Sequence, residues 1–202
     1  MQATRVATTD GLRFSMIKRG LDLLLLMLCL CVVMPLCIIS ASLVKLTSTG
    51  PILYWSSRVG KYNKIFRMPK FRSMHVGTPA VATHLLQRPD NYLTPVGNFL
   101  RKSSLDELPQ LWCILKGDMS FVGPRPALFN QEDLISLRTD AGVDALVPGL
   151  TGWAQVNGRD ELPIPDKVAL DIEYLQQQSL FLDIQILLLT FIKVIRRDSV
   201  TH

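Results

Sequence analysis

Residues 23–44, LLLLMLCLCVVMPLCIISASLV, decide how this chain is organised. These 22 residues include no charged side chain and are bounded by Asp22 and Lys45. A straight helix of that length measures about 33 Å, slightly more than the roughly 30 Å hydrocarbon core of a bilayer. We therefore expect a membrane helix here, rather than a cleaved signal peptide, whose apolar part is shorter.

Pro35, in the middle of this run, bears on the topology of the helix. Proline removes a backbone donor and kinks a helix, and each arm alone is too short to cross a bilayer. Basic residues flank the run on both sides, and the positive-inside tendency draws both flanks to the cytoplasm. Both features favour a re-entrant helix that enters one leaflet, bends at Met34-Pro35 and returns. A kinked helix that spans the membrane remains the alternative.

Composition narrows the class of protein. Hydrophobic residues make up 48% of the chain and charged residues 19%, which excludes a disordered or coiled-coil protein. The four cysteines form no Cys-x-x-Cys pair and the three histidines are scattered, so a zinc hydrolase is disfavoured. Much of the positive excess lies in residues 58–72, which contain no acid. Because few aromatic residues accompany it and an apolar anchor precedes it, we expect anionic lipids as partners and no nucleic acid.

The pattern along the chain predicts a mainly helical α+β fold in three parts. Residues 1–17 read as a loose tail, residues 18–46 as the re-entrant membrane helix and residues 47–202 as a compact catalytic domain. Two aromatic runs, 52–55 and 64–68, flank a Gly/Asn turn and predict one β-hairpin. Residues 96–115 and 167–178 have a helical pattern, whereas 117–126 and 147–158 are rich in Gly or Pro and read as irregular. Residues 180–195 are mostly apolar and fit either an amphipathic helix in the membrane interface or a core helix.

Two adjacent acids, Asp106 and Glu107, are the first candidate for chemistry, since such a pair can supply a nucleophile and a magnesium ligand. The alternative is structural, a capping box between Ser104 and Glu107. That capping box would put Pro109 where the helix needs an amide. A helix that begins near Asp106 tolerates Pro109 and places both acids at its positive end. The spacing leaves both interpretations open.

Two segments rich in glycine or proline supply further candidates. Pro124 and Pro126 hold Arg125 in extended backbone, from which a guanidinium suits bidentate contact with phosphate; a solvated arginine in a rigid turn is the alternative. Farther along, residues 148–159 combine three glycines with polar side chains able to line a pocket, namely Gln155, Asn157 and Arg159. The sequence has no Walker-type or Rossmann glycine fingerprint.

Five stretches in fixed order, between about Lys18 and Arg197, resemble the bacterial sugar transferase family. These are monotopic phosphoglycosyl transferases that start glycan assembly on undecaprenyl phosphate. The stretches are Lys18-Arg19-x-x-Asp22, Lys70-Phe71-Arg72-Ser73-Met74, residues 101–111, residues 116–126 and residues 148–159. One stretch alone is a modest signal, but five in this order are highly specific.

The resemblance implies a two-step reaction. Asp106 would attack the β-phosphorus of a UDP-sugar, expelling UMP and leaving a phosphosugar–aspartate, which the phosphate of undecaprenyl phosphate would then attack. Glu107, with Asp106 beside it, would hold Mg²⁺. Arg125 would contact phosphate or nucleotide, and the resemblance adds Lys70, Arg72 and Arg101 as further phosphate contacts.

The resemblance also implies a place in the cell and a set of partners. The enzyme would sit in the bacterial inner membrane with its catalytic domain on the cytoplasmic face, at the first membrane step of surface-glycan synthesis. Its membrane helix would be broken at Pro35, although Met34 stands where many members have serine. Seventeen residues before Lys18 lead us to expect the minimal catalytic form. The sugar is not identified, a homodimer is left open, and the alternative function is an inactive, membrane-tethered adaptor that binds nucleotide sugars or lipid phosphates.

Overall fold

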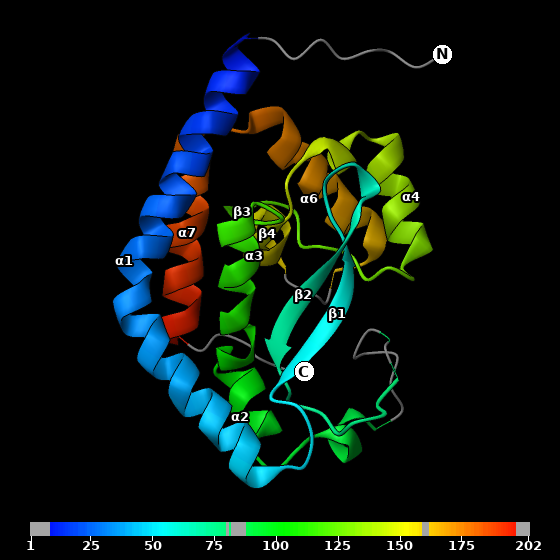
Figure 1. Ribbon diagram of the computed structural model, residues 1–202. Coiled ribbons are helices and arrows are strands. Elements are labelled where there is room, and N and C mark those ends of the chain that lie inside the picture. Colours follow the sequence, from blue (N-terminus) through cyan, green and yellow to red (C-terminus); the bar gives the residue numbers. More distant parts are fainter. Residues whose placement is uncertain (1–8, 80, 82–87, 159–161, 197–202) are drawn as a thin grey trace.

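The computed structural model describes residues 9–79, 81, 88–158 and 162–196 and shows the predicted α+β fold, mainly helical (Figure 1). One long helix, α1 (Thr9–Thr47), runs along one side of the molecule. It begins at Thr9, so the prediction of a loose tail is wrong for residues 9–17. Because adding residues to an existing helix is far easier than nucleating one, the apolar helix extends into this polar segment.

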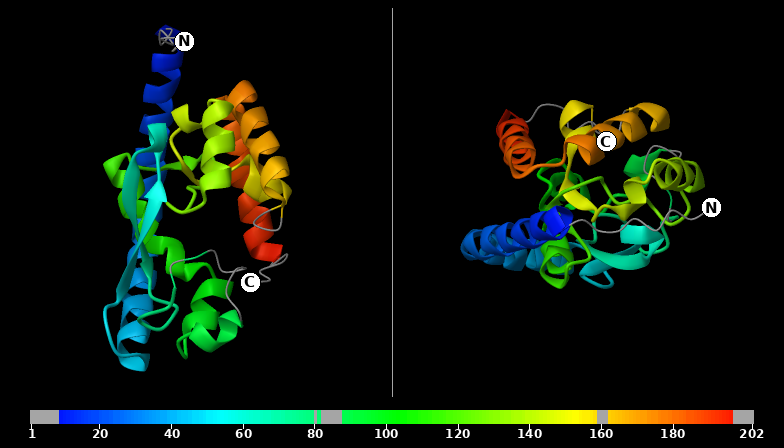
Figure 2. Two further views of the ribbon diagram at one scale, coloured as in Figure 1. Left: turned by 90° about the vertical axis from the view of Figure 1, so that its right-hand side faces the viewer. Right: turned by 90° about the horizontal axis from the view of Figure 1, so that it is seen from above.

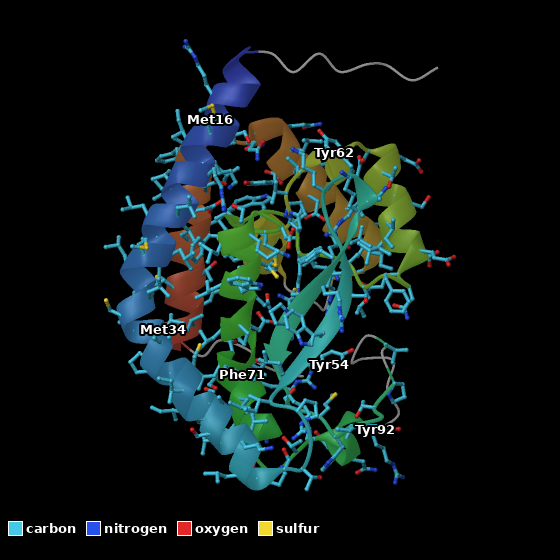
Figure 3. All side chains as sticks on the ribbon, in the orientation of Figure 1. Met16, Met34, Tyr54, Tyr62, Phe71 and Tyr92 are labelled. Carbon is cyan, nitrogen blue, oxygen red and sulfur yellow. The ribbon has the colours of Figure 1, made fainter. Side chains whose placement is uncertain are left out.

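Helix α1 continues through Pro35 and changes direction near Met34 (Figures 1 and 3). Of the described residues, Arg13–Thr47 form the one helix that is long and apolar enough to cross a membrane. Its far end packs against the domain, where Val44 joins Phe71 and Leu100 in a buried cluster. Most of its other large apolar side chains are exposed, including Leu24, Met27, Leu28, Val32, Met34, Ile38 and Ile39.

The predicted β-hairpin is confirmed. Strands β1 (Leu53–Val59) and β2 (Ile65–Phe71) pair antiparallel, and a single 3₁₀ turn, η1 (Lys61–Asn63), joins them. Tyr62 and Asn63 adopt positive φ in this turn. Met68 from β2 packs on Cys113 and Ile114, so the hairpin lies against the helices that follow.

The stretch predicted as helical from 96 to 115 is divided into three short helices. They are α2 (Gly97–Lys102), the 3₁₀ helix η4 (Leu105–Gln110) and α3 (Leu111–Lys116). Ser104 has a left-handed backbone, φ 55°, which ends α2, and Pro109 lies just before α3. The division places both acids on η4, against β2.

The two segments expected to be irregular contain regular structure. Strands β3 (Ser120–Val122) and β4 (Gly149–Thr151) form a parallel pair, and a short helix α5 (Trp153–Asn157) follows. A side chain on Gly149 or Gly152 would overlap the backbone of Gly123. The two segments therefore approach this closely only because all three residues are glycine. We read these glycines as loop signals, but here they permit the pairing.

Three longer helices follow β3, namely α4 (Glu132–Asp140), α6 (Ile164–Gln177) and α7 (Leu180–Arg196). Figure 2 shows α6 and α7 on the side away from β1 and β2, whereas Thr139 of α4 accepts a hydrogen bond from Asn63 in the hairpin turn. Two 3₁₀ turns are η3 (Pro89–Tyr92) and η5 (Val143–Ala145). In Figure 1 α7 lies behind α1, and the left view of Figure 2 separates the two helices.

Helix α7 has two apolar faces. One face is in the core, where Leu182 and Ile186 join Val122, Val156 and Tyr174. The other face is exposed and is formed by Phe181, Ile184, Leu188, Phe191, Ile192 and Val194. Spacing of three and four residues puts these side chains on one stripe. The helix is therefore a core helix whose outer face is apolar, and its location in a membrane interface stays a prediction.

Candidate active site

Glu107 is the centre of a cluster that three separate elements build. Its Oε1 accepts hydrogen bonds from Lys70 Nζ of β2 at 2.7 Å and from Arg125 Nη2, after β3, at 2.8 Å. Burial by itself would raise the pKa of Glu107, but Arg125 and Lys70 outweigh it and hold this pKa well below its ordinary value. Glu107 is therefore a fixed negative charge that aligns two cations.

Asp106, the adjacent acid, has a different environment. Only 7% of the residue is exposed. Burial raises the pKa of Asp106 to about 6; Lys70, Arg101 and Arg125 oppose the rise, and the neighbouring Glu107 adds to it. A carboxylate that is ionised at neutral pH yet poorly solvated is a reactive group, and perturbed acids of this kind are typical of functional sites.

The geometry excludes the capping box between Ser104 and Glu107. Ser104 makes no side-chain capping hydrogen bond, and the backbone N–H of Glu107 donates to the carbonyl of Ser104 instead. The Glu107 carboxylate turns to Lys70 and Arg125, so the capping box does not form.

Two partly buried hydrogen bonds fix the backbone at Arg125 and Pro126. Arg138 donates from Nη1 to the carbonyl of Arg125 at 2.8 Å, and Arg58 donates to the carbonyl of Pro126 at 3.0 Å. Arg138 itself is held by Asp171, whose Oδ2 accepts from its Nε and Nη2 at 2.9 and 2.6 Å. Sequence reasoning missed Arg138 and Asp171, because a pair 33 residues apart leaves no local pattern.

The Lys18-Arg19-x-x-Asp22 motif fastens the start of α1 to three other elements. Lys18 pairs with Asp183 of α7 at 2.5 Å, and Arg19 donates to the carbonyls of Ile114 and Leu115 at the end of α3. Asp22 Oδ1 accepts from the Ser120 hydroxyl and from the Phe121 N–H, both at 3.1 Å. The motif was noted only as part of a resemblance, and its partners are all about 95 or more residues away.

Arg72 fastens the other end of α1. Its guanidinium donates to the carbonyls of Ser48 and Thr49 and to the Ser48 hydroxyl at 2.6 to 2.9 Å, and the residue is buried. Ser48 and Thr49 directly follow the last residue of α1, Thr47, so these bonds fix the chain where it leaves the helix. The structure thus places Arg72 at the end of α1, whereas it brings Lys70, Arg101 and Arg125 to the acid pair.

The polar candidates after β4 are farther along the fold. Gln155 donates to the carbonyl of Leu150 at 3.4 Å, and its Oε1 is buried beside Gly152. Asn157 is exposed and donates to the carbonyl of Trp153 on its own helix. Arg159 lies outside the described residues. The part played by these three residues in binding stays a prediction.

The cavity behind Arg125 is too small to hold a nucleotide. A cavity of about 30 Å³ lies behind Arg125, between the hairpin turn and the η5 segment, and is lined by Gly60, Pro124 and Val143 among others. That volume holds roughly one or two waters and no nucleotide. Around the acid pair, three cations, Lys70, Arg101 and Arg125, face two carboxylates, and this excess of positive charge suits an anionic ligand.

The two carboxylates fit Mg²⁺ better than a metal that needs a full protein cage. No three His, Cys, Asp or Glu side chains gather into a metal site among the described residues. Magnesium keeps most of its waters and binds one or two carboxylates together with substrate phosphates. The carboxylates of the neighbouring residues Asp106 and Glu107 supply oxygen donors of this kind.

The sequence model of the bacterial sugar transferase family matches residues 13–197. The chain belongs to this family. The match includes α1, the acid pair on η4 and the β3–β4 segments, so the family's sequence pattern and the cluster described above coincide. The family resemblance inferred from the five motifs is confirmed.

Several curated relatives are similar to this bacterial sugar transferase. An undecaprenyl-phosphate glucose phosphotransferase of Komagataeibacter xylinus is 40% identical over 86% of this chain and 35% of its own length. A UDP-glucose:undecaprenyl-phosphate glucose-1-phosphate transferase of Escherichia coli K12 is 41% identical over 88% of this chain and 40% of its own length. The uncharacterized sugar transferase EpsL of Bacillus subtilis is 38% identical over 91% of this chain and 90% of its own. The chain therefore spans less than half of the first two relatives.

Proposed function

We propose that this sugar transferase moves a sugar-1-phosphate from a UDP-sugar to undecaprenyl phosphate, giving undecaprenyl-diphosphate-sugar and UMP. The observation that carries the proposal is the pairing of a buried acid with raised pKa, Asp106, and a fixed acid, Glu107, that aligns Lys70 and Arg125. The names of the relatives, which describe glucose, galactose and N-acetylgalactosamine phosphotransferases, support the same reaction.

In the first step, an Asp106 carboxylate oxygen forms a bond to the β-phosphorus, and the bond from that phosphorus to the bridging oxygen breaks. UMP leaves with the electron pair of that bond. The negative charge that builds up on the phosphoryl oxygens and the leaving group is offset by Lys70, Arg101 and Arg125. Fixed cations of this kind need no rearrangement as the reaction proceeds.

In the second step, an oxygen of the lipid phosphate bonds to the same phosphorus, and the aspartyl–phosphorus bond breaks to restore Asp106. Covalent capture divides one encounter between a soluble nucleotide and a lipid into two separate ones. We place Mg²⁺ on Glu107 and Asp106, where it would neutralise phosphate charge as a Lewis acid.

The fastening of α1 supports a re-entrant topology. Lys18, Arg19 and Asp22 bind one end of the helix to the domain, and Arg72 binds the other end to the same domain. A folded domain stays on one side of a bilayer, so polar contacts at both ends support a topology in which both ends lie on that side. The exposed apolar stripe of α7 would then lie in the membrane interface, which would put the site at the height of lipid headgroups. We assign the inner membrane and its cytoplasmic face, where UDP-sugars are made.

The proposal is tested by incubating the protein in detergent with UDP-sugars, magnesium and undecaprenyl phosphate, with Asp106→Asn beside the wild type. We expect UMP release from wild type and a loss of at least about 1,000-fold in the variant. Unchanged UMP release by Asp106→Asn would remove the covalent step. Binding of a UDP-sugar by wild type without any UMP release would favour the adaptor instead.

A further inference from the structure

We propose that the ring of Tyr54 is the platform on which the uracil base of the nucleotide donor stacks. This inference rests on the proposed function and adds to it a residue that recognises the nucleotide. Tyr54 belongs to none of the five motifs, and the cluster around Glu107 does not include it.

The register of the hairpin puts Tyr54 beside that cluster. Tyr54 is the direct partner of Lys70 across the β1–β2 pair. Directly opposed residues of antiparallel strands share a face, with their Cβ atoms about 5 Å apart. Lys70 Nζ lies 2.7 Å from Glu107 Oε1. The tyrosine ring and the ammonium group therefore extend from neighbouring points of the same face.

Tyr54 is an exposed aromatic residue of β1. Its exposed fraction is 45%, whereas its strand neighbour Leu53 is packed against the cluster of Val44, Phe71 and Leu100. Figure 3 labels Tyr54 and Phe71 at the same end of the hairpin. Among the described residues, none of the four buried apolar clusters includes Tyr54. Its ring is not needed for the core and has a free surface beside the site.

Trp55, the next residue, shows what the same hairpin does with a ring that points the other way. Trp55 is 41% exposed, on the opposite face of β1, and the Arg67 guanidinium lies over its ring at 5.7 Å. Two adjacent aromatic residues of similar exposure thus differ in their surroundings, because Trp55 lies against Arg67 whereas Tyr54 shares its face with Lys70, the lysine that binds Glu107.

The chemistry of the donor selects a base for this ring. Lys70, Arg101 and Arg125 can bind a diphosphate, but charge alone does not distinguish a nucleotide from inorganic diphosphate. A planar base stacks well on an aromatic side chain, and only one ribose separates it from the phosphates. Every UDP-sugar presents the same uracil, so one platform serves whichever sugar is transferred.

The test uses the full chain in detergent and compares wild type with Tyr54→Phe, Tyr54→Ala and the matched control Trp55→Ala. The readouts are the KM for the UDP-sugar, the KM for undecaprenyl phosphate and the Kd for UMP measured by titration. For Tyr54→Ala we expect the donor KM and the UMP Kd to rise together, each by about tenfold, with the lipid KM unchanged. Tyr54→Phe keeps the ring and should stay within about twofold of wild type.

Each other outcome overturns the inference in a recognisable way. A raised donor KM with an unchanged UMP Kd would place the ring against the sugar, and a raised lipid KM would place it against the acceptor. An equal effect from Trp55→Ala would trace the change to a weakened hairpin. Absence of turnover in wild type would count against the proposed function alone, since the UMP Kd still tests Tyr54.

Discussion

Two charged clusters, one around Glu107 and one around Asp183, both pair a carboxylate with a lysine but differ in the surroundings of their carboxylates. In the second cluster Asp183 accepts from Lys18 at 2.5 Å and from the Tyr174 hydroxyl at 2.6 Å, and it joins α1, α6 and α7. Burial, together with Asp183, raises the pKa of Tyr174, so the phenol remains a donor throughout the physiological range. In the first cluster Glu107 is paired twice, but Asp106 beside it remains buried with a raised pKa.

The difference separates a structural network from a reactive one. A carboxylate with a close cation and a hydroxyl donor is stable and joins elements, as at Asp183. A buried carboxylate whose pKa is raised is poised to react, as at Asp106. The predictions below test this contrast, from the largest expected effect to the smallest.

Lys18→Met should destabilise the protein strongly, because it leaves Asp183 as a buried charge without its cation. We expect a loss of about 3–5 kcal/mol of unfolding free energy, measured as a lowered Tm in detergent. Lys116→Met is the matched control, since the Lys116–Asp118 pair is exposed and exposed pairs contribute little to stability. Equal losses in the two variants would mean that the Asp183 cluster is not the structural network described here.

Arg125→Lys should lower the rate of UMP release by about 100-fold with little change in Tm. A lysine keeps the charge but loses the planar donor fork, while Lys70 still pairs with Glu107. The initial rate of UMP release, measured in quenched time-course assays, gives the effect. Arg67→Lys, on the outer side of the hairpin, is the control and should leave the rate unchanged. A fall confined to the KM for the lipid would instead assign Arg125 to the acceptor.

Asp106→Asn should raise stability at neutral pH although it abolishes UMP release. The folded pKa of about 6 lies above the unfolded value, so ionisation of Asp106 weakens the fold as pH rises from about 4 to 6. Removing the charge should recover up to about 3 kcal/mol at pH 7.5 and nothing at pH 4. Tm measured at both pH values checks this.

Glu107→Gln supplies the opposite sign within the same pair. The depressed pKa of Glu107 means that its charge stabilises the fold above the unfolded pKa, and this contribution is lost as pH falls. The glutamine variant should therefore have a lower Tm than wild type at pH 7.5. Matching shifts in Tm for the two variants would contradict the division of labour between the two acids.

The pH profile of the first step should show the smallest effect. Because the ionised form of Asp106 is the nucleophile, UMP release in the absence of lipid should rise about tenfold between pH 5 and pH 7 and then level off. Rapid-quench measurement of the initial UMP burst gives the profile. A flat profile across that range would mean that Asp106 is already ionised at pH 5.

Prediction from the sequence succeeded where the signal is local. The uncharged run with Pro35 predicted the long apolar helix and its bend, and aromatic runs around a Gly/Asn turn predicted the hairpin. It failed where glycines had two meanings, since Gly123, Gly149 and Gly152 read as loop residues but allow β3 and β4 to pair.

The sequence by itself determined the apolar anchor, the hairpin, the adjacent acids and the family, because each of these depends on residues that are close along the chain. Only the tertiary structure decided which cations serve the acids and which serve the anchor. Lys70 and Arg72 are two residues apart, yet one binds Glu107 and the other closes the end of α1. Lys18 meets a partner 165 residues away. Such choices depend on how the helices and strands pack together, and side-chain type and spacing along the chain do not specify that packing.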